Sequence, residues 1–131
     1  MKIGYQALVE AARREIDEIT PAQLQEMLIQ GDVLVVDVRD IRELEREGRI
    51  PGSFHCPRGM LEFWIDPASP YYNSVFGEGK RTVFYCSLGW RAALATQTAQ
   101  HMGLQHVMNL EGGFKAWKEA GGAVESLEKK S

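Results

Sequence analysis

Hydrophobic residues recur along the chain in two rhythms, and each rhythm predicts a different kind of secondary structure. Across residues 5–19, apolar positions follow one another at three- and four-residue steps, which predicts an amphipathic helix that ends before Thr20. A second helix is predicted next, with Thr20 as its N-cap, Pro21 as its first residue and Gly31 at its end. The start of the chain is therefore expected to be helical.

The second rhythm begins at residues 33–38, where a continuous β-branched run is typical of a strand that is covered on both faces. Further strands are predicted over residues 53–56, 82–86 and 107–110, and further helices over residues 91–102 and 114–120. Strands that alternate with helices along a chain favour a parallel sheet. We therefore predict an α/β fold with helices on both faces of a central, mostly parallel sheet.

Composition narrows the class of protein without identifying its chemistry. The chain of 131 residues is long enough for one domain, and its 44% hydrophobic and 25% charged residues are ordinary for a globular protein. A net charge of -3 and the lack of a dense Lys/Arg cluster argue against binding to nucleic acid. No apolar run reaches membrane-spanning length, and residues 1–20 lack the apolar core of a signal peptide. The expected location is therefore cytoplasmic, with no membrane partner.

One junction in the chain combines several features that point to chemistry. Cys86 ends a predicted strand, a short loop containing Gly89 follows, and a helix begins near Arg91. Ligands of open parallel sheets bind at the carboxyl ends of the strands, which is where this loop lies. The helix would turn its unpaired N–H groups and the positive end of its dipole toward Cys86, which favours a thiolate. We therefore expect Cys86 to be a nucleophile in an anion-binding loop, although a cysteine that ends a strand can also be a plain core residue.

Other polar residues and cysteines receive less reactive interpretations. Cys56 is expected to be an inert core thiol rather than a partner in a disulfide with Cys86. Arg58 follows a predicted strand, so it is a candidate for the border of the pocket. The three histidines have no partner at the spacing of metal ligands, and we expect no metal and no other cofactor.

Two charged residues follow the first long strand. Asp37 is expected to accept backbone N–H bonds and anchor neighbouring loops, which is a structural role. Arg39 is expected either to pair with a nearby carboxylate, such as Asp40 or Glu43, or to contact substrate.

These features occur together in the rhodanese-like (single-domain sulfurtransferase) family, which the chain resembles from about Ile19 to Val124. The resemblance is carried by four segments, which are VDVR at 36–39, GRIPGS at 48–53, CSLGWR at 86–91 and NLEGGFKAWKEAGG at 109–122. It implies a five-stranded, mostly parallel sheet. We accordingly divide the chain into an N-terminal helical extension (1–18), a rhodanese-like domain (19–125) and a frayed C-terminal tail (126–131).

The family resemblance also implies an activity and the residues that carry it. Cys86 would accept a sulfane sulfur from thiosulfate or a persulfide donor and pass it, as a persulfide, to a thiol or to cyanide. The substrate-binding loop would consist of Ser87, Leu88, Gly89 and Trp90, whose backbone amides, with that of Arg91, hold the outer sulfur. The side chain of Arg91 would fix the loop and complement its charge. The implied partners are a small-molecule or protein sulfur donor and a thiol acceptor, and the oligomeric state stays open.

Loop length and loop charge distinguish related chemistries. Four residues separate Cys86 from Arg91, whereas related phosphatases and arsenate reductases have one more, so this loop suits a single sulfur atom. It lacks the extra Arg or Lys that many thiosulfate-using members carry, which favours a less charged persulfide donor. Arg49 stands where the family commonly has a histidine.

Three functions remain in competition at this stage. An active sulfurtransferase is favoured by the Cys86 junction. A non-enzymatic persulfide carrier or protein-binding module is the first alternative, because the loop is neutral. A small phosphatase or arsenate reductase is the second alternative, which the short loop disfavours.

Overall fold

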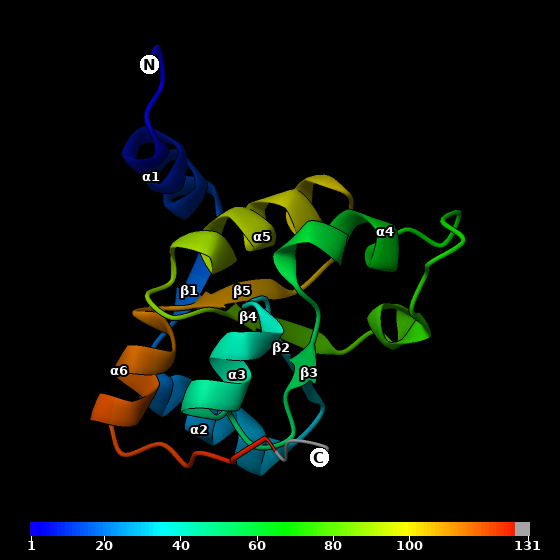
Figure 1. The fold of residues 1–131 in the computed structure, drawn as a ribbon. Coiled ribbons are helices and arrows are strands. Elements are labelled where there is room, and N and C mark those ends of the chain that lie inside the picture. Colours follow the sequence, from blue (N-terminus) through cyan, green and yellow to red (C-terminus); the bar gives the residue numbers. More distant parts are fainter. Residues whose placement is uncertain (128–131) are drawn as a thin grey trace.

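The computed structural model describes residues 1–127, in which a five-stranded sheet separates two layers of helices (Figure 1). The strands are β1 (Asp17–Ile19), β2 (Val33–Asp37), β3 (Phe54–His55), β4 (Arg81–Tyr85) and β5 (Val107–Leu110). They lie in the order β1-β5-β4-β2-β3, and every neighbouring pair is parallel. The predicted α/β architecture is therefore confirmed, including the five strands that the family resemblance implied.

The helices divide between the two faces of this sheet. They are α1 (Tyr5–Glu15), α2 (Pro21–Gln30), α3 (Ile41–Glu47), α4 (Leu61–Ile65), α5 (Trp90–His101) and α6 (Gly113–Glu119), with short 3-10 turns η1 (Arg58–Met60) and η2 (Ser74–Gly77). Helices α4 and α5 cover one face, whereas α2, α3 and α6 lie on the other (Figure 1). The predicted helices over 91–102 and 114–120 are each found one residue earlier, while α3 carries no counterpart in our sequence prediction.

Alternation along the central strands sorts side chains into two hydrophobic cores. In β4, Phe84 faces the core under α4 and α5, while Val83 and Tyr85 face the core formed with α2 and α6. Successive side chains of a strand point to opposite faces of the sheet. Cys86 continues the alternation and therefore lies on the α5 side, with Phe84.

The start of the chain differs from the prediction at one element. The first helix ends at Glu15 rather than continuing to residue 19, and the next residues form edge strand β1 beside β5. Ile16 and Ile19 fit a helical spacing, but residues 17–19 pair instead with the backbone edge of β5. Tertiary context thus overrides local periodicity. The predicted cap of the next helix is confirmed, because the Thr20 side chain accepts a hydrogen bond from the backbone N–H of Gln23.

The N-terminal helix packs onto the helix that follows the Cys86 loop (residues 86–91). Val9, Ala12 and Ile16 of α1 form a small apolar cluster with Ala93 of α5. Glu15, at the end of α1, accepts hydrogen bonds from side chains of α5, including that of His101 at 2.9 Å. The later part of the apolar stripe of this segment is therefore buried within the chain, whereas Tyr5 and Leu8 at its start are exposed.

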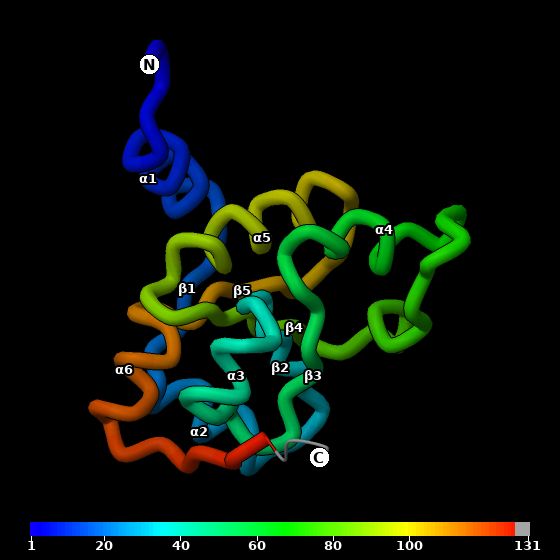
Figure 2. Tube along the Cα trace, in the orientation of Figure 1, coloured from blue at the N-terminus to red at the C-terminus, as the bar shows by residue number. Residues whose placement is uncertain are grey.

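The C-terminal segment returns beneath α3, as the tube in Figure 2 shows. Arg49 and Glu125 exchange two backbone hydrogen bonds, and their side chains form an ion pair at 3.0 Å. Arg49 thus holds the segment around Glu125, which follows α6, against the rest of the domain. Of the predicted tail, 126–131, residues 128–131 lie outside the described part, and the three-part division of the chain stays a prediction. Within residues 1–127, no helix has the length and apolar character needed to cross a bilayer.

Candidate active site

The Cys86 loop holds its sulfur atom against backbone N–H groups. Cys86 follows β4 directly, and its Sγ accepts hydrogen bonds from the N–H of Gly89 at 3.1 Å and of Ala92 at 3.4 Å. Gly89 adopts φ = 97°, a left-handed conformation that glycine reaches without strain, and α5 begins at the next residue. Of the amides expected to face the sulfur, from Ser87 to Arg91, that of Gly89 bonds Sγ in the described structure, and Ala92 is a contributor that the sequence analysis did not name. The role of these amides in binding substrate stays a prediction.

A carboxylate from α3 fixes the far end of the loop. Arg91 donates to both oxygens of Glu43, at 2.8 and 3.0 Å, and the Ser87 hydroxyl donates to the same carboxylate at 3.1 Å. The hydrogen bond from Arg91 is the main cause that lowers the pKa of Glu43 to about 2. The same bond raises the pKa of Arg91, to which the neighbouring Cys86 also contributes. The loop is thereby tied to the start of α3.

Sequence reasoning missed Glu43 as a part of this site, although a signal was present. Asp40 and Glu43 form a capping box at the start of α3, which is a recognisable helix-start pattern and places Glu43 in the first turn. That turn follows β2, whose carboxyl end neighbours that of β4. The two strand ends bring Glu43 to Arg91.

Arg39 pairs with a nearby carboxylate, which was one of its two expected roles, but that carboxylate is Asp37 and not Asp40 or Glu43, the two named as examples. Arg39 is fully buried and forms two-pronged hydrogen bonds with buried Asp37, the shortest being 2.7 Å, and it also reaches Glu47 at 3.3 Å. A buried guanidinium needs a fully paired carboxylate, and Asp37 supplies one from the end of β2. Asp37 also accepts the backbone N–H of Arg39, as its predicted structural role requires.

Helix α6 supports the loop from its backbone side. The N–H of Phe114 donates to the carbonyl of Cys86 at 2.7 Å, and that of Lys115 donates to the carbonyl of Ser87 at 3.1 Å. A Cβ at Gly113 would lie 2.6 Å from the carbonyl oxygen of Cys86, and Gly113 has φ = 63°. Only glycine allows α6 to approach the loop this closely, which explains the second glycine of the LEGG segment (residues 110–113).

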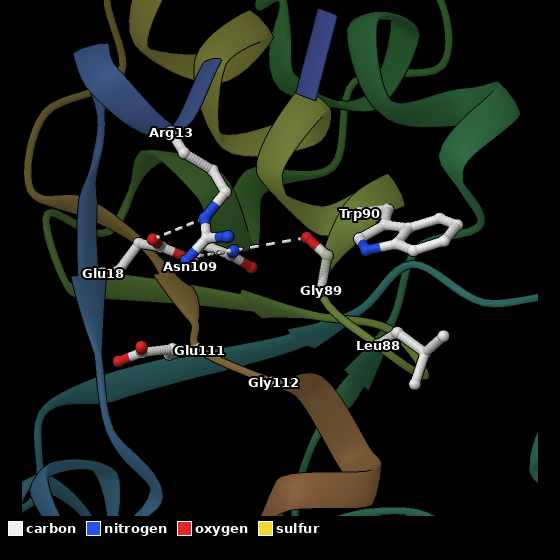
Figure 3. A pocket seen from close by; sticks show the side chains of 8 residues that line it. All are labelled: Arg13, Glu18, Leu88, Gly89, Trp90, Asn109, Glu111 and Gly112. Atoms are coloured by element: carbon white, nitrogen blue, oxygen red, sulfur yellow. Dashed lines mark hydrogen bonds and ion pairs between the residues drawn. The ribbon is translucent and has the colours of Figure 1, made fainter. Parts of the chain in front are cut away.

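A polar chain joins the N-terminal helix to the opposite side of the loop. Arg13 of α1 pairs with Glu18 at 2.8 Å, and Glu18 accepts a hydrogen bond from the Asn109 amide at 2.9 Å. The same amide group donates to the carbonyl of Gly89 at 3.3 Å, as the dashed lines in Figure 3 show. Asn109 thus restrains the peptide group next to the N–H that faces Cys86 Sγ.

Two cavities flank the loop at Leu88, and we name them by the helix beside each. The α1 cavity has a volume of about 270 Å³ and is lined by Arg13, Glu18, Leu88, Gly89, Trp90, Asn109, Glu111 and Gly112 (Figure 3). The α6 cavity has a volume of about 260 Å³ and is lined by Glu47, Ser87, Leu88, Phe114, Lys115 and Lys118. Trp90 is half-exposed at the first of them, and its ring centroid lies 5.3 Å from that of Tyr5.

The remaining predicted candidates lie elsewhere. Arg58 hydrogen-bonds Glu62 at 3.0 Å and Thr98 at 3.3 Å, and it lines neither the α1 cavity nor the α6 cavity. Cys56 and Cys86 are both free thiols, and burial raises the pKa of Cys56 to about 12. Among residues 1–127, no group of three or more His, Cys, Asp or Glu side chains is placed to hold a metal ion.

Known proteins resemble this chain in sequence or in structure. A solved structure from Rhodopseudomonas palustris, described as a protein of unknown function and possible tyrosine phosphatase, is 52% identical with a TM-score of 0.91, and the match covers 95% of this chain and 96% of that one. The human thiosulfate:glutathione sulfurtransferase is 29% identical over 74% of this chain and 89% of its own length. An uncharacterized Synechocystis protein is 35% identical over 79% of this chain, which spans about half (52%) of that relative.

A family-level match covers most of the domain. The sequence profile described as "Rhodanese-like domain" matches residues 20–120, which include the Cys86 loop, the α3 segment with Glu43 and the LEGG segment. Together with the parallel sheet and its strand order, this match shows that the chain belongs to the rhodanese-like domain family.

Proposed function

We propose that this protein is a sulfurtransferase that carries sulfane sulfur as a persulfide on Cys86. The observation that carries the proposal is the position of Cys86 Sγ, which receives two backbone N–H groups in a loop of four residues before Arg91. Such donors stabilise an anion on sulfur, first the thiolate and then the terminal sulfur of a persulfide. Family membership and a human relative named as a sulfurtransferase support the same chemistry.

The proposed reaction has two displacement steps. The Cys86 thiolate attacks the outer sulfur of the donor, an S–S bond of the donor breaks, and the leaving group departs with the electron pair. For thiosulfate that leaving group is sulfite, and Cys86 becomes a persulfide. An acceptor thiolate then attacks the outer sulfur, forms its own persulfide and returns Cys86 to the thiolate. Charge and atoms balance in both steps without a cofactor.

The residues around Cys86 have distinct positioning roles in this scheme. Glu43 and Arg91 hold the loop to α3, while Gly113 lets α6 support the carbonyl of Cys86. These contacts fix the N–H groups before substrate arrives, so little reorganisation accompanies the build-up of charge on sulfur. Arg91 also places a permanent positive charge beside the sulfur.

A phosphatase is the second candidate, because the Rhodopseudomonas palustris relative is described as a possible tyrosine phosphatase. Phosphoryl transfer through cysteine requires a loop that surrounds a tetrahedral oxyanion with several N–H donors. In this protein four residues separate Cys86 from Arg91, one fewer than in the related phosphatases, and the shorter loop suits a smaller, single-atom guest. Sulfur transfer is therefore the first choice.

The deciding experiment exposes the protein to a panel of thiosulfate, an organic persulfide and an aryl phosphate. Intact mass should increase by one sulfur atom with a sulfur donor, and peptide mapping should locate it at Cys86. Cys86→Ser should abolish the increase, whereas Cys56→Ala should retain it. Sulfur added to the Cys86→Ser variant, or phosphate release that depends on Cys86 in the absence of sulfur loading, would contradict the proposal.

Turnover separates an enzyme from a persulfide carrier. The loaded protein should lose its sulfur to cyanide or to a small thiol, and repeated cycles should release product in excess of protein. Loading followed by no release to either acceptor would favour the carrier. Thiol donors and acceptors also require a reducing compartment, so the expected cytoplasmic location forms part of this proposal.

A further inference from the structure

Asn109 of β5 lies on the same side of the sheet as Cys86. Val107 belongs to the core on the α5 side and Leu110 to the core on the opposite side, so alternation along β5 turns Asn109 toward α5. Strand β5 is also the direct neighbour of β4, which Cys86 follows. Asn109 is only 1% exposed, and a polar side chain that is removed from water needs hydrogen-bond partners.

Two acceptors fix the orientation of the Asn109 amide. Its Nδ2 donates to Glu18 Oε2 at 2.9 Å and to the carbonyl of Gly89 at 3.3 Å. A carboxylate and a carbonyl both accept, so the NH₂ group rather than the oxygen must face them. The oxygen, Oδ1, is left buried without a hydrogen-bond partner among residues 1–127. An unpaired buried oxygen disfavours folding, so stability alone does not explain an asparagine at this position.

The bond to Gly89 acts on the residue whose N–H faces the sulfur. The N–H of Gly89 donates to Cys86 Sγ at 3.1 Å, and its carbonyl accepts from Asn109. The two groups flank one Cα, so a bond that holds the carbonyl also limits rotation of the N–H. Glycine has the widest choice of backbone conformations, which makes an external restraint more effective here than at other residues.

Residues that precede the family match hold the other partner of Asn109. Glu18 lies directly opposite Asn109 in the pairing of β1 with β5, and it accepts a hydrogen bond from Arg13 Nε at 2.8 Å. Arg13 belongs to α1, and both residues lie before residues 20–120, which the family profile matches. A series of bonds therefore runs from Arg13 through Glu18 and Asn109 to Gly89 (Figure 3).

We infer that Asn109 is a positioning residue for Cys86, through which the N-terminal extension (residues 1–18) sets the reactivity of this cysteine. Arg13 and Glu18 hold the Asn109 amide, the amide holds Gly89, and the N–H of Gly89 stabilises negative charge on the sulfur. The role in sulfur transfer rests on the proposed function, whereas the reactivity of the thiol is a separate property.

The test is the rate at which iodoacetamide, a neutral reagent, alkylates Cys86 at a fixed pH, followed by peptide mapping. Asn109→Leu keeps a side chain of similar size and removes both hydrogen bonds. It should slow alkylation roughly ten-fold, because Gly89 no longer holds its N–H toward the sulfur. The rate of sulfur loading at Cys86 should fall by a similar factor.

Chemical denaturation separates positioning from a structural role. In Asn109→Leu, the Gly89 carbonyl keeps its bond from the N–H of Ala93 at 2.9 Å, and Glu18 keeps its bond from Arg13. Neither acceptor is left unpaired, so the denaturation midpoint should stay close to that of the wild type while both rates fall. A lower midpoint with unchanged rates in the folded protein would identify Asn109 as a structural residue and overturn the inference.

A double-variant cycle shows whether Glu18 acts through Asn109. Glu18→Leu should slow alkylation of Cys86, and Glu18→Gln, which keeps an oxygen that accepts from Asn109, should recover most of that loss. The combination of Glu18→Leu with Asn109→Leu should be no slower than Asn109→Leu alone. Arg13→Gln should slow alkylation by about two-fold. Arg14→Gln removes the same charge from an exposed neighbour on α1 and should leave the rate unchanged.

The two proposals fail in distinguishable ways. If no sulfur donor loads Cys86 in the wild-type protein, the proposed function fails, and the alkylation rates still decide the role of Asn109. If sulfur loads Cys86 but Asn109→Leu changes neither rate, the positioning role is overturned. Additive losses from Glu18→Leu and Asn109→Leu would overturn the part assigned to the N-terminal extension, because Glu18 would then act by another route.

Discussion

Cys56 and Cys86 lie in the same hydrophobic core on the α5 side of the sheet, with 0% and 1% of their surfaces exposed. Their polar surroundings are opposite. The Cys86 sulfur faces two backbone N–H donors, whereas the Cys56 thiol has only the carbonyl oxygen of Pro57 at 4.0 Å within hydrogen-bonding reach in the described structure. Donors stabilise a thiolate, and a carbonyl stabilises the protonated thiol.

This comparison shows that burial alone does not decide the chemistry of a cysteine. Both side chains are removed from water, and the shift in pKa that burial causes is seen at Cys56. At Cys56 burial raises the pKa of the thiol to about 12, and the nearby positive charge of Arg58 lowers this pKa by less than burial raises it. At Cys86 a glycine turn and the start of α5 supply N–H groups, so the backbone conformation marks this cysteine as the reactive candidate.

The largest expected difference between the two cysteines is in alkylation. At pH 8 a thiol with a pKa of about 12 is a thiolate in about one molecule in ten thousand. Iodoacetamide should therefore modify Cys86 at least a hundred times faster than Cys56 in the native protein, as measured by peptide mapping over time. Comparable rates at both positions would show that the N–H groups do not activate Cys86. Unfolding in denaturant should make both reactive and serves as the control.

Gly113→Ala should damage the Cys86 site next most strongly. The new Cβ would lie 2.6 Å from the carbonyl oxygen of Cys86 in a left-handed backbone conformation, so α6 or the loop must move. We expect a loss of roughly 3 kcal/mol in the free energy of unfolding, and sulfur loading slowed in the fraction that folds. Gly121→Ala is the matched control, because Gly121 has φ = 80° but open space around its Cα. That control should cost about 1 kcal/mol, and equal losses in chemical denaturation would contradict the packing argument.

Glu43→Gln should have an intermediate effect that depends on pH. The pKa of Glu43 is lowered from 4.5 to about 2 in the folded protein, so its contribution is complete above pH 4.5 and disappears as pH falls through 2. The variant should lose about 2 kcal/mol of unfolding free energy at pH 7, and roughly half of this difference should remain at pH 3.

Denaturant titrations at several pH values measure the Glu43 effect. Glu62→Gln, which breaks the more exposed ion pair with Arg58, should change stability by less than about 1 kcal/mol at any pH. A difference between wild type and Glu43→Gln that stays constant from pH 7 to pH 3 would exclude the ion pair with Arg91 as its source.

The smallest effect is expected at the inert cysteine. Cys56→Ala should leave the rate of sulfur loading within two-fold of wild type, because Cys56 takes no part in the proposed chemistry. It should lower the free energy of unfolding by about 1 kcal/mol, since the lost sulfur leaves a small void in the core. Loading kinetics and denaturation measure the two quantities. A strong loss of sulfur loading would contradict this prediction and indicate that Cys56 is a second reactive thiol.

Periodic elements and the Cys86 junction could be predicted from the sequence because their signals are local. The β-branched run of β2 predicts a buried strand, and the order of cysteine, glycine and arginine before α5 predicts an anion-binding loop. The strand β1 could not be predicted, because its three residues pair only with β5, at the other end of the chain. Which neighbouring carboxylate pairs with Arg39 could not be predicted either, because Asp37 is buried beside it at the end of β2 whereas Asp40 is half-exposed.

The α/β class, the cysteine–glycine–arginine order of the candidate site and the number of residues in the loop follow from the sequence alone, because each depends on a few consecutive residues. Only the tertiary structure brought Glu43 to Arg91 and Asn109 to Gly89. Parallel strands place their carboxyl ends at one edge of the sheet, so residues far apart along the chain meet there. Which of them meet depends on strand order, and strand order depends on long-range packing rather than on any local pattern.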